Sequence, residues 1–173
     1  EAPAVATLDS DRGFGLVIGP QAMKMAVDRA ERYGIGAVCV TNGAHFGAAA
    51  YHAAMALEHD MIGLAMTTGS LRMVPTHGSK PMAGLNPLAV AVPAGDEPPF
   101  IFDGTMSSVA GNKIVLAQRL GVPLPPGWIS DKDGTPIMEE GPIPNEWMLL
   151  PLGGTREIGS HKGFSLAVMI EVL

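Results

Sequence analysis

The sequence has little charge, few aromatic residues and no long hydrophobic run. Charged side chains make up 16% of its 173 residues, against roughly 25% in an average globular protein. The net charge is −6 and aromatic residues make up 5%. Without a basic stretch, this composition argues against nucleic acid as a partner. No apolar run approaches the roughly 18 residues that a membrane-spanning helix needs, so we expect no membrane partner.

Cysteine is nearly absent, which excludes a disulfide framework. The single thiol, Cys39, lies in a β-branched run that predicts a buried strand. This usage fits a reducing compartment and predicts a cytoplasmic location. No signal peptide is visible. The chain starts at Glu1 and stops inside an apolar helical run, 164–173. We therefore expect one domain over residues 1–173 that belongs to a longer protein, with portions missing at both ends.

Hydrophobic residues make up 47% of the chain, which predicts strands covered on both faces and apolar surface buried against a partner. Strands and helices are expected to alternate, which favours an α/β domain with a largely parallel sheet. The expected strands are 5–8, 36–41, 61–66, 88–93 and 99–103, and the expected helices are 20–33 (beginning at Pro20), 47–59, 109–120 and 164–173.

Two long segments, 68–87 and 121–161, are rich in proline and glycine and carry no periodic pattern. Loops beyond about 15 residues are uncommon in compact domains unless they are functional or held by contacts. Apolar side chains in the second segment indicate that it is held in place, within the domain or across a subunit interface; they are Trp128, Trp147, Met148, Leu149 and Leu150.

His45 is the candidate for the chemistry. It follows the predicted strand 36–41 and a turn at 42–44, and it precedes the helix 47–59. The carboxyl end of a strand and the amino end of a helix form the crevice in which open α/β sheets bind ligands. An imidazole at that place can exchange a proton near neutral pH. A structural histidine is the alternative interpretation.

The glycine-rich stretch 13–19 resembles the Rossmann dinucleotide fingerprint only at first sight. Its third glycine, Gly19, comes one residue late. The end of the next strand reads Thr41-Asn42, where the fingerprint needs an acidic residue for the ribose. We interpret these glycines as turn residues, and no P-loop is present.

His45, His52 and His59 recur every seven residues on one predicted helix face. Seven residues are two helical turns, or roughly 10 Å. Zinc sites on a helix use closer spacing, such as i and i+4. We therefore predict no metal site and interpret His52 and His59 as surface or packing residues.

Two further segments combine small residues with a following helix. Residues 103–109, from Asp103 to Val109, could cradle a phosphate or a ribose, or Ser107 or Ser108 could simply cap the next helix. In the second segment, Lys162 opens a helix. A cation at that end opposes the helix dipole, which indicates an anionic ligand, with a solvated lysine as the alternative.

Several motifs occur in a specific order along essentially the whole chain: Asn-Gly-Ala-His-Phe-Gly at 42–47, Gly-Leu-Asn-Pro at 84–87, residues 103–113, Pro-Gly-Trp at 126–128 with Asp131, Gly134 and Pro136, Pro-Leu-Gly-Gly at 151–154, and Lys162-Gly163. In this order the chain resembles the malate/L-lactate dehydrogenase-like oxidoreductases. That family also contains sulfolactate, ureidoglycolate and diketogulonate enzymes and a cyclic-imine reductase, and it is unrelated to the Rossmann-type lactate and malate dehydrogenases.

The resemblance implies a three-layer α/β/α sandwich with a mixed, largely parallel, non-Rossmann sheet. Residues 1–173 would then form a dinucleotide-binding oxidoreductase domain of a homodimer. The implied reaction is hydride transfer between NAD or NADP and C2 of a small 2-hydroxy or 2-oxo acid. His45 corresponds to the acid/base of some members. The implied cofactor contacts are Thr68, Gly69, Asp103, Gly104, Thr105, Lys162 and Gly163.

The chain departs from the family pattern at four positions, where it has Gly43, Gly69, Leu85 and Asn112. It also lacks the upstream Ser-His-Gly motif whose histidine is the proton donor assigned in other members. A non-catalytic nucleotide-binding protein and a cyclic-imine reductase of the piperideine-2-carboxylate type are therefore the alternative functions. The sequence does not distinguish NAD from NADP.

Overall fold

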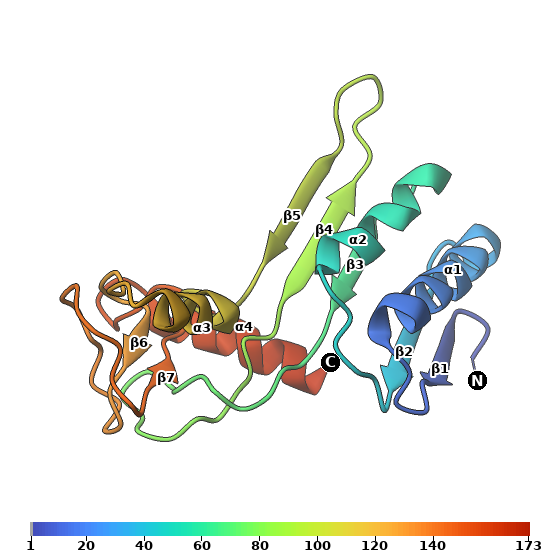
Figure 1. Ribbon diagram of the computed structural model, residues 1–173. Coiled ribbons are helices and arrows are strands. Elements are labelled where there is room, and N and C mark those ends of the chain that lie inside the picture. Colours follow the sequence, from blue (N-terminus) through green and yellow to red (C-terminus); the bar gives the residue numbers. More distant parts are fainter. Residues whose placement is uncertain (1) are drawn as a thin grey trace. The chain divides into compact units, whose positions relative to one another are not determined.

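The computed structural model describes residues 2–173, which form two compact units (Figure 1). The first unit comprises residues 2–65 and 88–103, and the second comprises 66–87 and 104–173. The elements that begin in the first unit are β1 (Val5–Asp9), α1 (Gly15–Tyr33), β2 (Ala37–Thr41), α2 (Ala49–Ala54), the 3₁₀ helix η1 (Met55–His59), β3 (Gly63–Met66), β4 (Leu88–Val92) and β5 (Phe100–Gly104). The second unit contains α3 (Gly111–Leu120), β6 (Ile129–Ser130), β7 (Met148–Leu149) and α4 (Ser160–Val172).

The first unit begins with a β-α-β arrangement, as predicted. β1 and β2 pair in parallel, from Val5 opposite Ala37 to Asp9 opposite Thr41. α1 connects them and packs on β2. The helix ends at Gly34, whose left-handed φ of 81° lets its N–H return to the carbonyl of Ala30. The parallel pair and the mixture of helices and strands confirm the predicted α/β class.

The predicted start of α1 at Pro20 is wrong, because the helix already begins at Gly15 and Pro20 lies inside it. The ring of Pro20 removes one N–H, which in a regular helix would donate to the carbonyl of Leu16. The glycines of this stretch also differ from the prediction. Gly13 does lie in a turn, donating to the carbonyl of Ser10 at 2.7 Å. Gly15 and Gly19, however, are helical residues.

The prediction that β2 is buried is also wrong. Its residues are mostly exposed, and Cys39 is an exposed free thiol. α1 packs on β2, but an open depression of about 540 Å³ lies over the pair, lined by Val5, Ala6, Thr7, Ala37 and Cys39. The apolar run marks a strand correctly, but within the described residues its second face is not covered.

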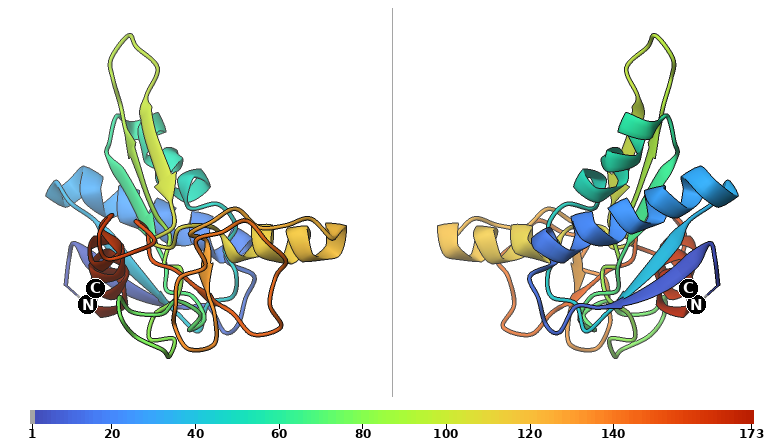
Figure 2. Two further views of the ribbon diagram at one scale, coloured as in Figure 1. Left: turned by 90° about the vertical axis from the view of Figure 1, so that its left-hand side faces the viewer. Right: turned by 90° about the vertical axis from the view of Figure 1, so that its right-hand side faces the viewer.

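α2 lies closely on β4 because the contact is built from alanine. Ala49 and Ala53 of α2 are buried against Ala89 and Ala91 of β4. Such short side chains allow a close approach of helix and strand. β4 is the middle strand of β3-β4-β5, and Figure 2 shows β4 and β5 as two arms of a long hairpin. The outer strand β5 leaves large apolar side chains exposed, namely Phe100, Ile101 and Phe102.

The long loops of the second unit are held by backbone pairing, which confirms the prediction that they are fixed by contacts. Leu149 of β7 donates to the carbonyl of Arg72 at 2.8 Å and accepts from the N–H of Val74 at 3.1 Å. β7 also pairs antiparallel with β6. Met148, Leu149 and Leu150 are buried as expected. Over residues 2–173, none of the helices has both the length and the apolar character needed to cross a membrane.

Candidate active site

His45 lies on the exposed loop that leads from β2 into α2, as the sequence predicted. Its Nδ1 accepts a hydrogen bond from the backbone N–H of Gly47 at 3.1 Å. A nitrogen that accepts carries no proton, so the proton of the neutral ring is on Nε2. The imidazole therefore presents an N–H donor on the side away from its own backbone.

Asp103 is brought to the same helix end as His45. Its Oδ2 accepts a 2.8 Å hydrogen bond from the N–H of Ala50, in the first turn of α2. The N-cap residue of this helix is Ala48, which has no side chain able to cap it. Asp103 thus caps α2 from the end of β5, and its negative charge is favourable at the positive end of the helix dipole.

The other two histidines of the seven-residue series have different surroundings. His59 is on the surface, where its Nδ1 lies 3.0 Å from Oε1 of Glu31. His52 is only 2% exposed and hydrogen-bonds through Nε2 to the carbonyl of Phe46. His52 is therefore a packing residue and His59 a surface residue. Within residues 2–173, no three His, Cys, Asp or Glu side chains gather as a set of metal ligands.

In the second unit, the predicted contact Gly69 is fixed by a buried amide. The N–H of Gly69 donates to Oδ1 of Asn86 at 2.8 Å. The Nδ2 of Asn86 donates to the carbonyl of Ala167 and to Oε1 of Glu171, both at 2.9 Å. Asn86 is fully buried and has a left-handed φ of 35°. Asn86 therefore ties the loop at residues 68–69 to α4. In this loop Thr68 is exposed and Gly69 is half-buried.

The Gly104–Thr105 segment is also held by specific hydrogen bonds. The hydroxyl of Thr105 donates to the carbonyl of Ser107 at 3.2 Å. Ser107 donates to the carbonyl of Val109 at 2.8 Å, and Ser108 donates to that of Pro151 at 2.7 Å. Neither serine caps α3, whose N-cap residue is Ala110, so the interpretation of this stretch as a simple serine cap is wrong.

Leu152 connects this segment to the start of α4. Its N–H donates to the carbonyl of Met106 at 2.9 Å. Gly163 packs against the Leu152 backbone so closely that a Cβ at Gly163 would lie 2.6 Å from the Leu152 nitrogen. The structure thus places Thr105 and Lys162-Gly163 on segments that both contact the 151–154 turn. Only glycine permits this approach at position 163.

The start of α4 is electropositive. Lys162 is exposed in the first turn, after the N-cap residue Gly159. Desolvation, followed by the positive charges of Arg156 and Lys162, lowers the pKa of His161 below its usual value. Arg156 and Lys162 therefore place positive charge at the helix end whose dipole is also positive, next to the carboxylate of Glu157.

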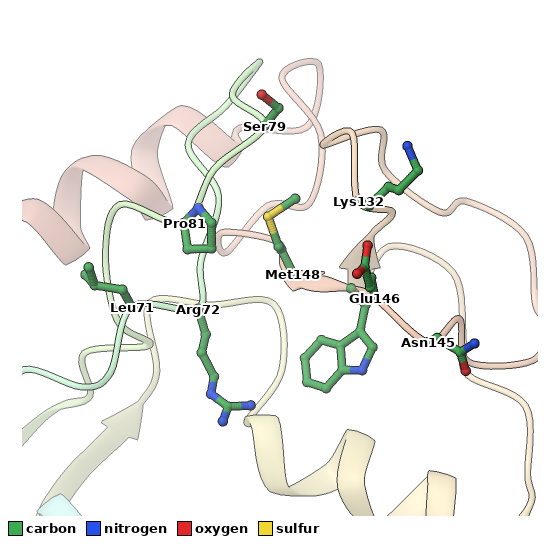
Figure 3. Close-up of a pocket in the computed structure, with 9 residues that line it drawn as sticks. Leu71, Arg72, Ser79, Pro81, Lys132, Asn145, Glu146 and Met148 are labelled. Carbon is green, nitrogen blue, oxygen red and sulfur yellow. The ribbon is translucent and has the colours of Figure 1, made fainter.

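A cleft of about 620 Å³ in the second unit contains none of the predicted site residues (Figure 3). It is lined by Leu71, Arg72, Ser79, Pro81, Lys132, Asn145, Glu146, Trp147 and Met148. The amine of Lys132 and the guanidinium of Arg72 point away from each other in Figure 3. Lys132 already pairs with Asp133 at 2.8 Å. The two cations therefore do not converge on one anion.

Sequence reasoning did not identify Asn86 or Glu171 as part of the site. Their contact joins residues 85 positions apart in the chain, so no local pattern reveals it. The Gly-Leu-Asn-Pro motif was a partial signal, because an asparagine directly before proline favours a turn. The position of Asp103 at the N-terminus of α2 was equally invisible, since it depends on the pairing of β4 and β5.

Comparisons with known proteins agree with these observations. The family model described as malate/L-lactate dehydrogenase matches residues 1–173. A malate dehydrogenase of Pyrococcus abyssi is 41% identical over 174 residues, covering 100% of this chain and 48% of that protein. The chain spans about half the length of the curated relatives that it matches.

Solved structures show the same fold. Malate dehydrogenase from Entamoeba histolytica superposes with a TM-score of 0.90 at 35% identity, over 99% of this chain and 49% of that one. Δ¹-Piperideine-2-carboxylate reductase from Pseudomonas syringae pv. tomato gives 0.87 at 29% identity, over 100% and 50%. These likenesses confirm the fold that the resemblance implied. The chain belongs to the malate/L-lactate dehydrogenase family.

Proposed function

We propose that the complete protein is an NAD(P)-dependent oxidoreductase that transfers a hydride between nicotinamide and C2 of a small 2-hydroxy or 2-oxo acid. The observation that carries this proposal is the geometry of His45. Its Nδ1 is engaged by Gly47 at 3.1 Å, so Nε2 holds a proton on an exposed loop at the end of a strand. This arrangement suits a general acid that acts on a substrate oxygen.

In the reduction direction, uptake of a proton at Nδ1 forms the imidazolium and releases the hydrogen bond from Gly47. Nε2 then donates its proton to the oxygen that develops negative charge at C2, which leaves a neutral ring with its proton on Nδ1. In the oxidation direction, this neutral ring accepts the hydroxyl proton at Nε2. The N–H of Gly47 therefore binds only the resting form, in which Nε2 is protonated and Nδ1 is bare. A bound nicotinamide supplies or accepts the hydride, and the protein's contribution is orientation and proton transfer.

The residues of the second unit fit a dinucleotide. Its diphosphate is anionic, and the start of α4 carries the cationic side chains of Arg156 and Lys162; desolvation first, and then these two charges, lower the pKa of His161. Gly163 lets the first turn of α4 pack on the backbone of Leu152, which fixes the helix N-terminus, and the N–H groups at such an end bind phosphate. We therefore propose that Lys162 and Gly163 bind the diphosphate. Thr68, Gly69, Asp103, Gly104 and Thr105 remain the other proposed cofactor contacts, to NAD or to NADP.

The likeness to a piperideine-2-carboxylate reductase supports a second candidate, reduction of a cyclic imine. The chemistry is related, because a hydride again adds to a carbon next to a carboxylate and the adjacent heteroatom gains a proton. The departures at Gly43 and Leu85 change groups beside His45 and Asn86 in the chain, which fits a substrate preference that differs between members.

A substrate panel tests the function. The complete protein is assayed for oxidation of NADH and NADPH with oxaloacetate, pyruvate, sulfopyruvate, diketogulonate and piperideine-2-carboxylate. We expect turnover with one or more of the 2-oxo acids. Turnover with the cyclic imine alone would favour the reductase. Tight NADH binding without oxidation in any assay would support a non-catalytic nucleotide-binding protein and contradict the proposal.

We further propose that the protein is a cytoplasmic homodimer. β5 exposes Phe100 by 62% and Phe102 by 42% on one face and Ile101 by 46% on the other, and exposed apolar surface on both faces of a strand favours burial against a partner. Sedimentation equilibrium of the complete protein should give twice the monomer mass. A monomer mass at micromolar concentration would contradict the dimer.

A further inference from the structure

A buried imidazole contacts the loop that carries His45. His52 of α2 is 2% exposed, and its Nε2 lies 2.7 Å from the carbonyl oxygen of Phe46, the residue after His45. Its ring also stacks on that of Phe46, with centroids 4.9 Å apart and 13° between the planes. One side chain therefore contacts both the backbone and the ring of Phe46.

The hydrogen bond determines which ring nitrogen is protonated. A carbonyl oxygen only accepts, so Nε2 of His52 must carry the proton. The opposite nitrogen, Nδ1, is buried and has no hydrogen-bond partner within the described residues. Leaving a ring nitrogen unpaired costs free energy. The ring keeps this orientation because Phe46 fixes it from one side and α1 contacts it from the other.

α1 contributes two glycines to this contact. Gly15 and Gly19 are four residues apart and so lie on one face of the helix. A Cβ at Gly19 would lie 2.7 Å from Nδ1 of His52, and a Cβ at Gly15 would lie 2.6 Å from Cα of Phe46. Glycine inside a helix is less favourable than alanine. Here the missing side chain makes room for His52 and for the loop.

We propose that His52 is a positioning residue for His45, supported by Gly15 and Gly19 of α1. The hydrogen bond from His52 fixes the Phe46 carbonyl, and Phe46 lies between His45 and Gly47, whose N–H binds the His45 ring. The glycine-rich stretch 13–19 thus serves the loop of the acid/base rather than a dinucleotide. This inference rests on the proposed function for its effect on turnover, but not for its effect on the loop.

The first experiment compares two substitutions in the complete protein. His52→Leu removes the donor and keeps much of the apolar volume, whereas His52→Gln retains an N–H near the position of Nε2. We expect His52→Leu to lower kcat by about 10- to 100-fold, since a small misplacement of a catalytic group has effects of that size. The KM and the dissociation constant of NADH should stay unchanged, and His52→Gln should restore most of kcat. Equal activities of the two variants would overturn the proposal.

A substitution in α1 tests the same contact from the other side. Gly19→Ala improves helix propensity, yet its methyl group displaces the His52 ring. We expect kcat to fall in the same way as in His52→Leu. Combined with His52→Ala, which removes the ring, Gly19→Ala should have no further effect on kcat. Additive effects of the two substitutions would show that the glycine does not act through His52.

NMR separates this inference from the proposed function. In protein labelled with ¹⁵N-histidine, His52 should show the protonated Nε2 tautomer, and the Phe46 carbonyl ¹³C shift should change in His52→Leu but not in His52→Gln. These results hold even if His45 proves dispensable for turnover, in which case only the proposed function fails. A protonated Nδ1 with a bare Nε2 would overturn the positioning role directly.

Discussion

Replacing His45 by asparagine in the complete protein should lower kcat for reduction of the preferred 2-oxo acid by about 10²–10⁴-fold, the usual contribution of general acid–base catalysis. Asparagine preserves a polar side chain on the exposed loop but cannot transfer a proton near neutral pH. The dissociation constant of NADH, measured by fluorescence titration, should remain that of the unsubstituted protein, because the cofactor contacts proposed above do not include His45.

His59→Asn is the matched control for this measurement. It makes the same substitution fourteen positions later, at a histidine that pairs with Glu31 on the surface. Its turnover should equal that of the unsubstituted protein. If His45→Asn also keeps turnover within a few-fold of the unsubstituted protein, then His45 is not the acid/base, and a histidine outside residues 1–173 becomes the candidate.

Asn86→Leu should be the most destabilising of the substitutions considered. The change leaves the N–H of Gly69 and the buried carbonyl of Ala167 without the partner that they have at 2.8 and 2.9 Å. Each buried polar group left unsatisfied costs about 1–3 kcal/mol, and leucine at the left-handed φ of 35° adds strain. We expect a total loss of about 3 kcal/mol, seen as a Tm lower by several degrees in scanning calorimetry.

Asn145→Leu serves as the control, because Asn145 is exposed in the same unit. Its Tm should stay close to that of the unsubstituted protein. A second pair of substitutions tests the same contact by changing the charge at positions 86 and 171. Asn86→Asp places a second carboxylate against Glu171 and should be destabilising, whereas Glu171→Gln in the same chain supplies a donor and should recover part of the loss. If Asn86→Leu and Asn145→Leu have the same Tm, Asn86 does not hold the Gly69 loop.

The sequence predicts the position of His45 well, because the signal is local. A β-branched strand, a small-residue turn and an alanine-rich helix follow one another within about twenty residues, and each element forms where its composition favours it. The same locality explains the error at α1, where proline favours the first turn statistically but is tolerated inside this helix.

Burial and contacts between distant parts of the chain could not be predicted from the sequence in the same way. The apolar run of β2 identifies a strand, but whether it is covered depends on segments far away in the chain, and Cys39 is exposed among the described residues. The bonds of Asp103 to α2 and of Asn86 to α4 likewise join residues more than fifty positions apart. Such partners depend on which strands pair and on where helices pack, and the hydrophobic periodicity of a segment predicts neither.

The proposed hydride transfer is tested most directly with a labelled cofactor. The complete protein is incubated with its preferred 2-oxo acid and NADH or NADPH that carries deuterium at C4 of the dihydronicotinamide, and the product is analysed by ¹H NMR. We predict a 2-hydroxy acid with deuterium at C2 from one of the two C4-labelled diastereomers and hydrogen at C2 from the other. A product that carries no deuterium with either diastereomer, or no product at all, would contradict the account.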